Sequence, residues 1–153
     1  MNQKQTRTIM KKISEIKEKH TKREVQDLEL DKAERIAGHL DALSPKCTDC
    51  RNYLEELKKE TVNLAVLNEL DSKTILNYRE FLQTISNHLK EKHEMVQEGT
   101  GTSLGIAIGV AVGVALGLSV FNNIAVGIAL GLAVGLSLGA GIDSRAKKNG
   151  KMI

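Results

Sequence analysis

The chain has 153 residues, enough for one modest domain and a short additional segment, and its formal net charge is +3. All of this charge lies after residue 142, because residues 1–100 carry eighteen Lys and Arg and eighteen Asp and Glu. With no tryptophan, two tyrosines and two phenylalanines, the chain lacks the basic surface and the aromatic rings of a nucleic-acid-binding domain. The first residues, MNQKQTRTIMKK, have no apolar run after their charges, so we expect no secretory signal.

Residues 7–43 predict one long polar helix. Apolar residues recur at helical spacing near both of its ends, whereas the segment KHTKREVQDLELDKAER between them is almost wholly charged. Two interpretations remain open for this helix. It is either a solvated helix with many i,i+4 ion pairs or an arm that binds a partner through a thin apolar stripe.

Two further helices are expected before the uncharged segment that begins at residue 101. Pro45 ends the first helix, because the residue before a proline avoids the helical conformation. The second helix runs from about Cys47 to Leu70, with its buried side formed by Tyr53, Leu54, Leu57, Leu64, Leu67 and Leu70. The third begins near Lys73, with its buried side formed by Ile75, Tyr78, Leu82, Ile85, Leu89 and Val96. Short joints predict an antiparallel three-helix domain over residues 1–98.

A C-x2-C pair, Cys47 and Cys50, stands at the start of the second helix. In a chain that is not exported the thiols stay reduced, which favours a metal or redox site over a disulfide. The second and third helices are each about 35 Å long at ~1.5 Å per residue, so the third returns beside the cysteines. His88 and His93 lie at that end of the third helix, and His93 continues its apolar row. His39 reaches the same pole from the first helix.

We therefore expect a structural Zn²⁺ site formed by His39, Cys47, Cys50 and His93. Two thiolates and two imidazoles complete a tetrahedral shell, and four protein ligands leave no open position for a catalytic water. A redox dithiol and plain structural cysteines remain as alternatives, as does His88 in place of His39 or His93. In a small domain with few large apolar residues, a metal would clamp the helix ends together.

Residues 101–141 contain no charged residue, and glycine recurs at every fourth position. Such rows let transmembrane helices pack until their backbones touch, so residues 99–142 predict a glycine-zipper hairpin that turns at Phe121-Asn122-Asn123. The expected packing residues are Gly101, Gly105, Gly109, Gly113, Gly117, Gly127, Gly131, Gly135 and Gly139. The same alternation of small and large residues has a period of two, which is also the pattern of a strand. Segments of about 18 residues are long for a membrane strand, and the fourfold glycine row favours helices. The expected fold class is all-α.

A second row of small residues lies two positions out of step with the glycines, on the opposite face of each helix. It comprises Ser103, Ala107, Ala111, Ala115 and Ser119, then Ala125, Ala129, Ala133 and Ser137. A helix with small residues on two opposite faces can pack closely against a neighbouring helix on each side. Such a helix suits a homo-oligomer, including a ring. The tail 143–153 carries Arg145, Lys147, Lys148 and Lys151, which predict that both ends of the hairpin face the cytoplasm.

Two resemblances follow from these residues. HLDALSPKCTDCRNYLEEL resembles the histidine-then-CxxC helix of bacterial zinc-binding anti-sigma factors, with a longer spacer between His39 and Cys47. KEKHEMVQEG, the glycine hairpin and the tail GAGIDSRAKKNGKMI resemble small bacterial glycine-zipper membrane proteins. The second resemblance implies a role of the kind played by antiphage effectors that permeabilise the cell's own membrane.

No nucleophile–base pair, carboxylate dyad or phosphate-binding loop stands out, so we expect no enzyme. The leading hypothesis is an oligomerising effector that disrupts or forms a pore in the cytoplasmic membrane during abortive infection. Its expected partners are itself, the lipid bilayer and a protein trigger such as an oligomeric phage structure, with no nucleic acid. It would reside in the cytoplasmic membrane, or in the cytosol until triggered. The alternatives are a membrane-anchored zinc-domain regulator and a non-toxic membrane-organising protein.

Overall fold

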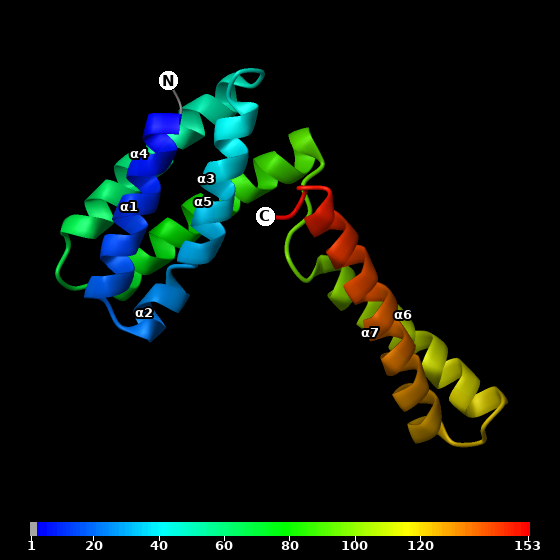
Figure 1. Cartoon of the computed structure of the whole chain (residues 1–153). Helices are drawn as coiled ribbons and strands as arrows, with labels where there is room; N and C mark the ends of the chain where they lie inside the picture. The colour runs from blue at the N-terminus through cyan, green and yellow to red at the C-terminus, as the bar shows by residue number, and fades with distance from the viewer. Residues whose placement is uncertain (1–2) are drawn as a thin grey trace. The chain divides into compact units, whose positions relative to one another are not determined.

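The computed structural model describes residues 3–153 and is all-α within them, as the sequence predicts (Figure 1). Its helices are α1 (Gln3–Lys19), α2 (Lys22–Asp27), α3 (Leu30–Leu43), α4 (Thr48–Val66), α5 (Ser72–His93), α6 (Thr100–Ser119) and α7 (Ile124–Lys148). The chain divides into two compact units, one that runs to Lys92 and one from His93 to Met152. We call the first the bundle unit and the second the hairpin unit.

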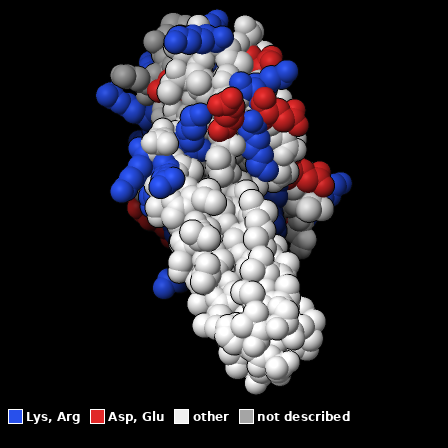
Figure 2. All heavy atoms as spheres, turned by 90° about the vertical axis from the view of Figure 1, so that its right-hand side faces the viewer, with Lys and Arg blue, Asp and Glu red and all other residues white. Residues whose placement is uncertain are grey.

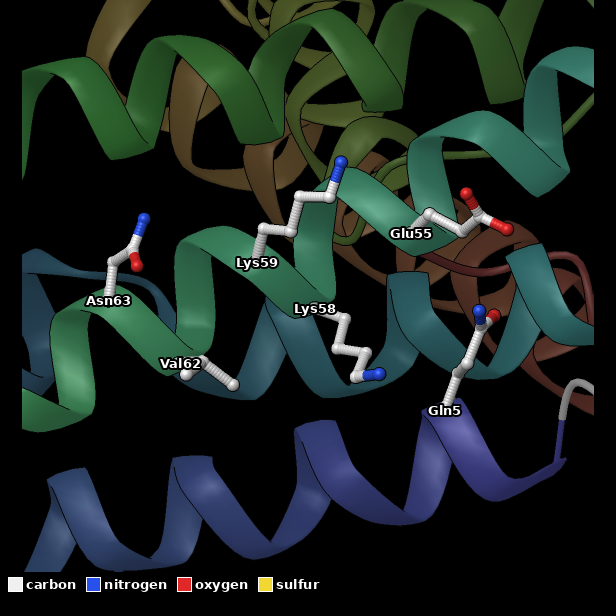
Figure 3. Close-up of a pocket in the computed structure, with 6 residues that line it drawn as sticks. All are labelled: Gln5, Glu55, Lys58, Lys59, Val62 and Asn63. Carbon is white, nitrogen blue, oxygen red and sulfur yellow. The ribbon is translucent and has the colours of Figure 1, made fainter.

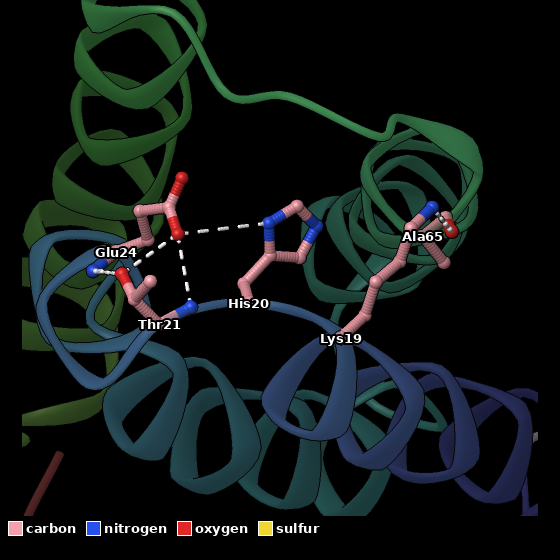
Figure 4. Close-up of polar contacts among 5 residues, drawn as sticks. All are labelled: Lys19, His20, Thr21, Glu24 and Ala65. Atoms are coloured by element: carbon pink, nitrogen blue, oxygen red, sulfur yellow. Dashed lines mark hydrogen bonds and ion pairs between the residues drawn. The ribbon is translucent and has the colours of Figure 1, made fainter.

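The expected single helix over residues 7–43 is wrong, because the chain breaks twice and forms α1, α2 and α3. The first break is a capping box that the sequence Thr-Lys-Arg-Glu encodes (Figure 4). The Thr21 hydroxyl accepts a hydrogen bond from the Glu24 amide at 3.3 Å, and the Glu24 carboxylate accepts from the Thr21 amide at 2.9 Å. These bonds satisfy amide groups that a helix start leaves unpaired, which is why α2 begins there.

The second break lies at Glu29, whose backbone is left-handed with φ of 52°. It explains why Leu28 and Leu30 are both fully buried although they are two residues apart. In a continuous helix these two side chains would point about 200° apart, and one of them would face solvent. The bundle unit therefore has five helices in place of the three expected.

The core of the bundle unit consists of large aliphatic side chains from α1, α3, α4 and α5. As predicted, Leu54, Leu57 and Leu64 are buried on α4, whereas Leu67 is 38% exposed because α4 ends at Val66. The predicted row on α5 is buried at Tyr78, Leu82, Ile85 and Leu89. Lys17 also links α1 to α3 through ion pairs with Asp31 at 2.7 Å and Glu34 at 2.9 Å.

The hairpin unit contains α6 and α7, which pack against each other from Gly117 and Ile124 near the turn to Gly101 and Gly139. The turn between them contains the predicted Phe121-Asn122-Asn123, with Asn122 in a left-handed conformation at φ of 46°. Asn123 starts α7, since its side chain accepts hydrogen bonds from the amides of Ala125 at 3.1 Å and Val126 at 3.3 Å. α7 continues to Lys148, so part of the basic tail is helical.

Candidate metal centre and membrane hairpin

Both cysteines lie in the first turn of α4, where local structure brings their thiols together. Pro45 follows the end of α3, and Cys47 is the N-cap residue of α4 in an extended conformation. The Cys47 sulfur accepts a hydrogen bond from the Cys50 amide at 3.4 Å. Cys50 is buried, whereas Cys47 is partly exposed. The C-x2-C spacing thus places one thiol at the helix entrance and the other one turn inside.

His88 of α5 completes a three-residue contact with these thiols. Its Nε2 atom lies 3.5 Å from the Cys47 sulfur and 3.4 Å from the Cys50 sulfur. The imidazole ring also packs against Tyr53, with ring centroids 5.3 Å apart. His93, the last residue of α5, adds a fourth donor, and one ligand atom from each of the four residues lies within 4.8 Å of the others.

These distances fit a tetrahedral zinc shell. With Zn–S near 2.3 Å and Zn–N near 2.0–2.1 Å, the sulfur-to-nitrogen edge of a tetrahedron is about 3.5 Å. In the structure the two edges from the His88 Nε2 atom to the thiol sulfurs are 3.4 and 3.5 Å. Thiolate and imidazole ligands also suit zinc, whereas magnesium and calcium prefer oxygen ligands. The group formed by Cys47, Cys50, His88 and His93 is therefore able to hold a metal ion.

The electrostatics of Cys50 agree with this geometry. Burial, together with the neighbouring Cys47 and Asp49, raises the pKa of the Cys50 thiol to about 12. The buried Cys50 thiol holds its proton at neutral pH unless a cation takes its place, because a bare thiolate there would be poorly solvated. In this setting a divalent metal would supply the compensating charge.

The structure brings together three of the four predicted ligands and replaces the fourth, since His88 stands where His39 was expected. Helix lengths correctly predicted which helix ends meet, but they do not determine how each helix is rotated about its axis. His88 immediately precedes the buried Leu89, so it lies at the edge of the buried face of α5. The α4 thiols meet that edge, whereas His39 of α3 is not part of the group.

In the hairpin unit, all nine predicted packing glycines lie between α6 and α7. The observed glycine pairs that meet at a carbonyl oxygen are Gly101 with Gly139, Gly105 with Gly135, Gly109 with Gly131 and Gly113 with Gly127. Gly117 faces the start of α7, where a methyl group would lie 2.8 Å from the Ile124 Cα atom. At each pair a methyl group would collide with a carbonyl oxygen of the opposite helix, so only glycine permits this approach.

With the glycines packed inward, every residue of the second small row is exposed. The Ser119 hydroxyl donates to the Ala115 carbonyl at 2.7 Å, and the Ser137 hydroxyl donates to the Ala133 carbonyl at 2.8 Å. These serines thus add no unsatisfied hydroxyl to the outer surface. Beside this row runs an apolar groove of about 470 Å³ between two ridges, formed by Leu104, Ile108, Val112 and Leu116 and by Leu130, Val134, Leu138 and Ile142.

α6 and α7 are each long and apolar enough to cross a membrane. Only 22% of the apolar window of α6 and 17% of that of α7 are buried within the protein, unlike the core helices of soluble proteins. Figure 2 shows the far end of the hairpin as a surface without charged side chains. At its base, Arg145, Lys147 and Lys148 lie in the last turn of α7, and Lys151 pairs with Glu94 at 3.1 Å.

One hollow on the bundle unit is not a convincing site. It has a volume of about 370 Å³ and lies between Gln5 of α1 and five α4 residues, Glu55, Lys58, Lys59, Val62 and Asn63 (Figure 3). The side chains spread apart and carry charges of both signs, so they do not converge on one ligand. This surface corresponds to the solvated face of α4.

Together, these features define an α-helical, membrane-associated protein with a possible metal centre. Residues 91–145 match the family model described as glycine zipper membrane protein, which confirms the predicted resemblance to such proteins. No curated protein and no solved structure matches the chain. The resemblance of the His39–CxxC segment to anti-sigma factors remains a prediction.

The sequence prediction gives too little weight to one residue of these sites, His88, and misses another, Asp143. His88 is only an alternative ligand in the sequence prediction, because it leaves the apolar row of α5. Asp143 comes four residues after Gly139 and so takes the next place in the glycine row. The sequence could have indicated a role for Asp143, because it is the first charged residue at a position of the glycine row. The carboxylate accepts hydrogen bonds from the start of α6.

Proposed function

We propose that the protein is a non-enzymatic effector that assembles in the cytoplasmic membrane and permeabilises it. The observation that carries this proposal is the pair of exposed Ala/Ser rows on α6 and α7. An anchor needs only one apolar surface toward lipid. Here the glycines are used within the hairpin, and each helix still presents a second slim face on which another hairpin can pack closely. Because both α6 and α7 carry an exposed row of small residues, hairpins can pack side by side into a ring or sheet of helices.

The bundle unit would supply control in this proposal. Zn²⁺ held by Cys47, Cys50, His88 and His93 would be structural, since four protein ligands leave no open coordination position. The resemblance to glycine-zipper proteins of the permeabilising type supports a role in abortive infection, with an oligomeric phage structure as the trigger. The basic residues at the base of the hairpin support an orientation with both ends in the cytoplasm.

A dye-release experiment on liposomes tests the effector proposal. The full-length protein is expected to release an entrapped dye, and Ala111→Leu with Ala133→Leu is expected to reduce release strongly by thickening the outer faces. A matched control, Val112→Leu, enlarges an exposed residue outside the small rows and is expected to retain release. Release by the outer-face variant at the wild-type rate, or no release by the wild-type oligomer, would contradict the proposal.

A second candidate function is a membrane-anchored regulator whose bundle unit holds a cytosolic partner. It is favoured by one observation, the separate compact bundle unit with its own core and with three residues of the metal-binding group, Cys47, Cys50 and His88. Replacing residues 99–142 with an unrelated transmembrane hairpin distinguishes the two. Retained function would support the regulator, whereas lost function with normal membrane insertion would support the effector. Harmless overexpression with an intact membrane potential would instead point to a membrane-organising protein.

A further inference from the structure

The first turn of α6 receives its cap from the far end of α7. The N-cap residue of α6 is Gly99, which has no side chain to accept a hydrogen bond. One Asp143 carboxylate oxygen accepts from the Gly101 amide at 2.8 Å, and the other accepts from the Thr102 amide at 2.9 Å and the Thr102 hydroxyl at 2.6 Å. These amides are the ones that a capping side chain ordinarily satisfies at the start of a helix. Asp143 therefore supplies, from the opposite helix, the cap that Gly99 cannot provide.

The glycine rows by themselves do not determine the register of the hairpin. In the observed register eight pairs of glycines are in contact. Four meet at a carbonyl oxygen, from Gly101 with Gly139 to Gly113 with Gly127, and four at a Cα atom, from Gly105 with Gly139 to Gly117 with Gly127. Moving α7 by one glycine step, ~6 Å along the axis, would bring the second four pairs into the place of the first. Three new pairs, Gly109 with Gly139, Gly113 with Gly135 and Gly117 with Gly131, would then take the place of the second four. Close backbone packing is thus nearly as available in the shifted arrangement as in the observed one.

The Asp143 cap is available only in the observed arrangement. One glycine step would carry Asp143 a full turn past the amides of Gly101 and Thr102, into the row where backbones touch. A carboxylate facing helix backbone and apolar side chains, without donors, is strongly unfavourable. A second contact favours the same register, because the Val96 amide donates to the Lys151 carbonyl at 2.7 Å. The chain before α6 is thereby paired with the chain after α7.

We propose that Asp143 is the register lock of the hairpin: it selects one of two arrangements that the glycines alone leave nearly equivalent. The lock also holds the hairpin closed at its base. Loss of the carboxylate permits α7 to move by one glycine step or to separate from the start of α6. This property belongs to the folded hairpin and does not depend on the proposed membrane-permeabilising activity.

Spin-label distances test the register in full-length protein reconstituted in lipid bilayers. Genetically encoded labels at Ala107 and Ala125, both exposed, leave the cysteines untouched, and dilution with unlabelled protein removes distances between copies. The wild type is expected to give one narrow distribution. Asp143→Ala is expected to add a population whose axial separation is ~6 Å longer, or to broaden the distribution. An unchanged single distribution in Asp143→Ala would overturn the proposal.

Amide hydrogen exchange gives a second, local measurement. Asp143→Ala is expected to accelerate exchange at Gly101 and Thr102 on the order of tenfold through loss of the cap. Thr102→Val removes only the hydroxyl contact and is expected to cause a smaller acceleration in the same direction. Gly141→Ala is the matched control, since no atom lies within 4 Å of the added methyl group. If Asp143→Ala does not fold, Thr102→Val provides the test. Amide exchange at the wild-type rate at Gly101 and residue 102 of that variant would contradict the proposed lock.

Discussion

The two units of this protein achieve close packing by opposite means. The bundle unit fills its interior with large aliphatic side chains, such as Ile13, Leu57 and Leu82, all fully buried. The hairpin unit places almost no side chain between its helices, because glycines allow the backbones of α6 and α7 to touch. A core of side chains loses stability when atoms are removed, whereas a zipper of backbones loses its structure when atoms are added. The following substitutions and measurements test this difference, from the largest expected effect to the smallest.

Gly109→Leu is expected to open the hairpin. A methyl group at Gly109 would already fall on the Gly131 carbonyl oxygen and lie 3.0 Å from the Gly135 Cα atom. The helices must then move apart toward the ~8–10 Å interaxial distance of ordinary helix pairs. Spin-label distances across the hairpin measure this change. Gly141→Leu is the matched control, because the space around its added carbon is open; an unchanged distance in Gly109→Leu would contradict the backbone-contact interpretation.

Metal binding is expected to stabilise the bundle unit. At free Zn²⁺ a thousandfold above the dissociation constant, a 1:1 site adds about 4 kcal/mol, visible as a rise in melting temperature that a chelator reverses. Cys50→Ser and His88→Ala are expected to weaken binding by at least the ~10–100-fold seen for substitutions in the outer shell of metal sites. His39→Ala is the control and is expected to bind normally. Normal binding by His88→Ala would refute the assigned ligand set.

Leu57→Ala is expected to destabilise the bundle unit by about 2–5 kcal/mol, because it leaves a cavity among fully buried side chains. Urea unfolding followed by circular dichroism measures the loss. Hydrogen exchange in α6 and α7 should stay at the wild-type rate if the two units have independent cores. Leu76→Ala serves as control, since Leu76 is 55% exposed and its truncation should change stability by less than about 0.5 kcal/mol.

Gly38→Ala is expected to have the smallest effect and the opposite sign from Gly109→Leu. Gly38 lies within α3, and no atom stands within 4 Å of an added methyl group. Alanine costs less backbone entropy than glycine in a helix, so the bundle unit should gain up to about 1 kcal/mol. The urea midpoint measures this gain. A loss of stability would mean that this surface of α3 is covered in the assembled protein.

Local sequence signals accounted for the helices where caps and periodicity agreed. Pro45 correctly marked the end of α3, and the Leu54–Leu57–Leu64 spacing identified the buried side of α4. The Thr21–Glu24 capping box was equally visible in the sequence, but the charged segment around it was interpreted as a continuous helix. Leu28 and Leu30 show what this interpretation missed, because their spacing fits no single helix with both residues buried.

Sequence alone therefore determined the glycine hairpin, its turn and the pole at which the cysteines meet the end of α5. These features depend on spacing along one chain segment and on helix length, which are fixed by residue number. Only the tertiary structure decided that His88 joins the thiols and that Asp143 caps α6. Both choices depend on helix rotation and on register, which are set by the contacts of residues far apart in the sequence. A repeating glycine row specifies register only weakly, because neighbouring registers make almost the same contacts. One carboxylate beyond the end of the row can specify it.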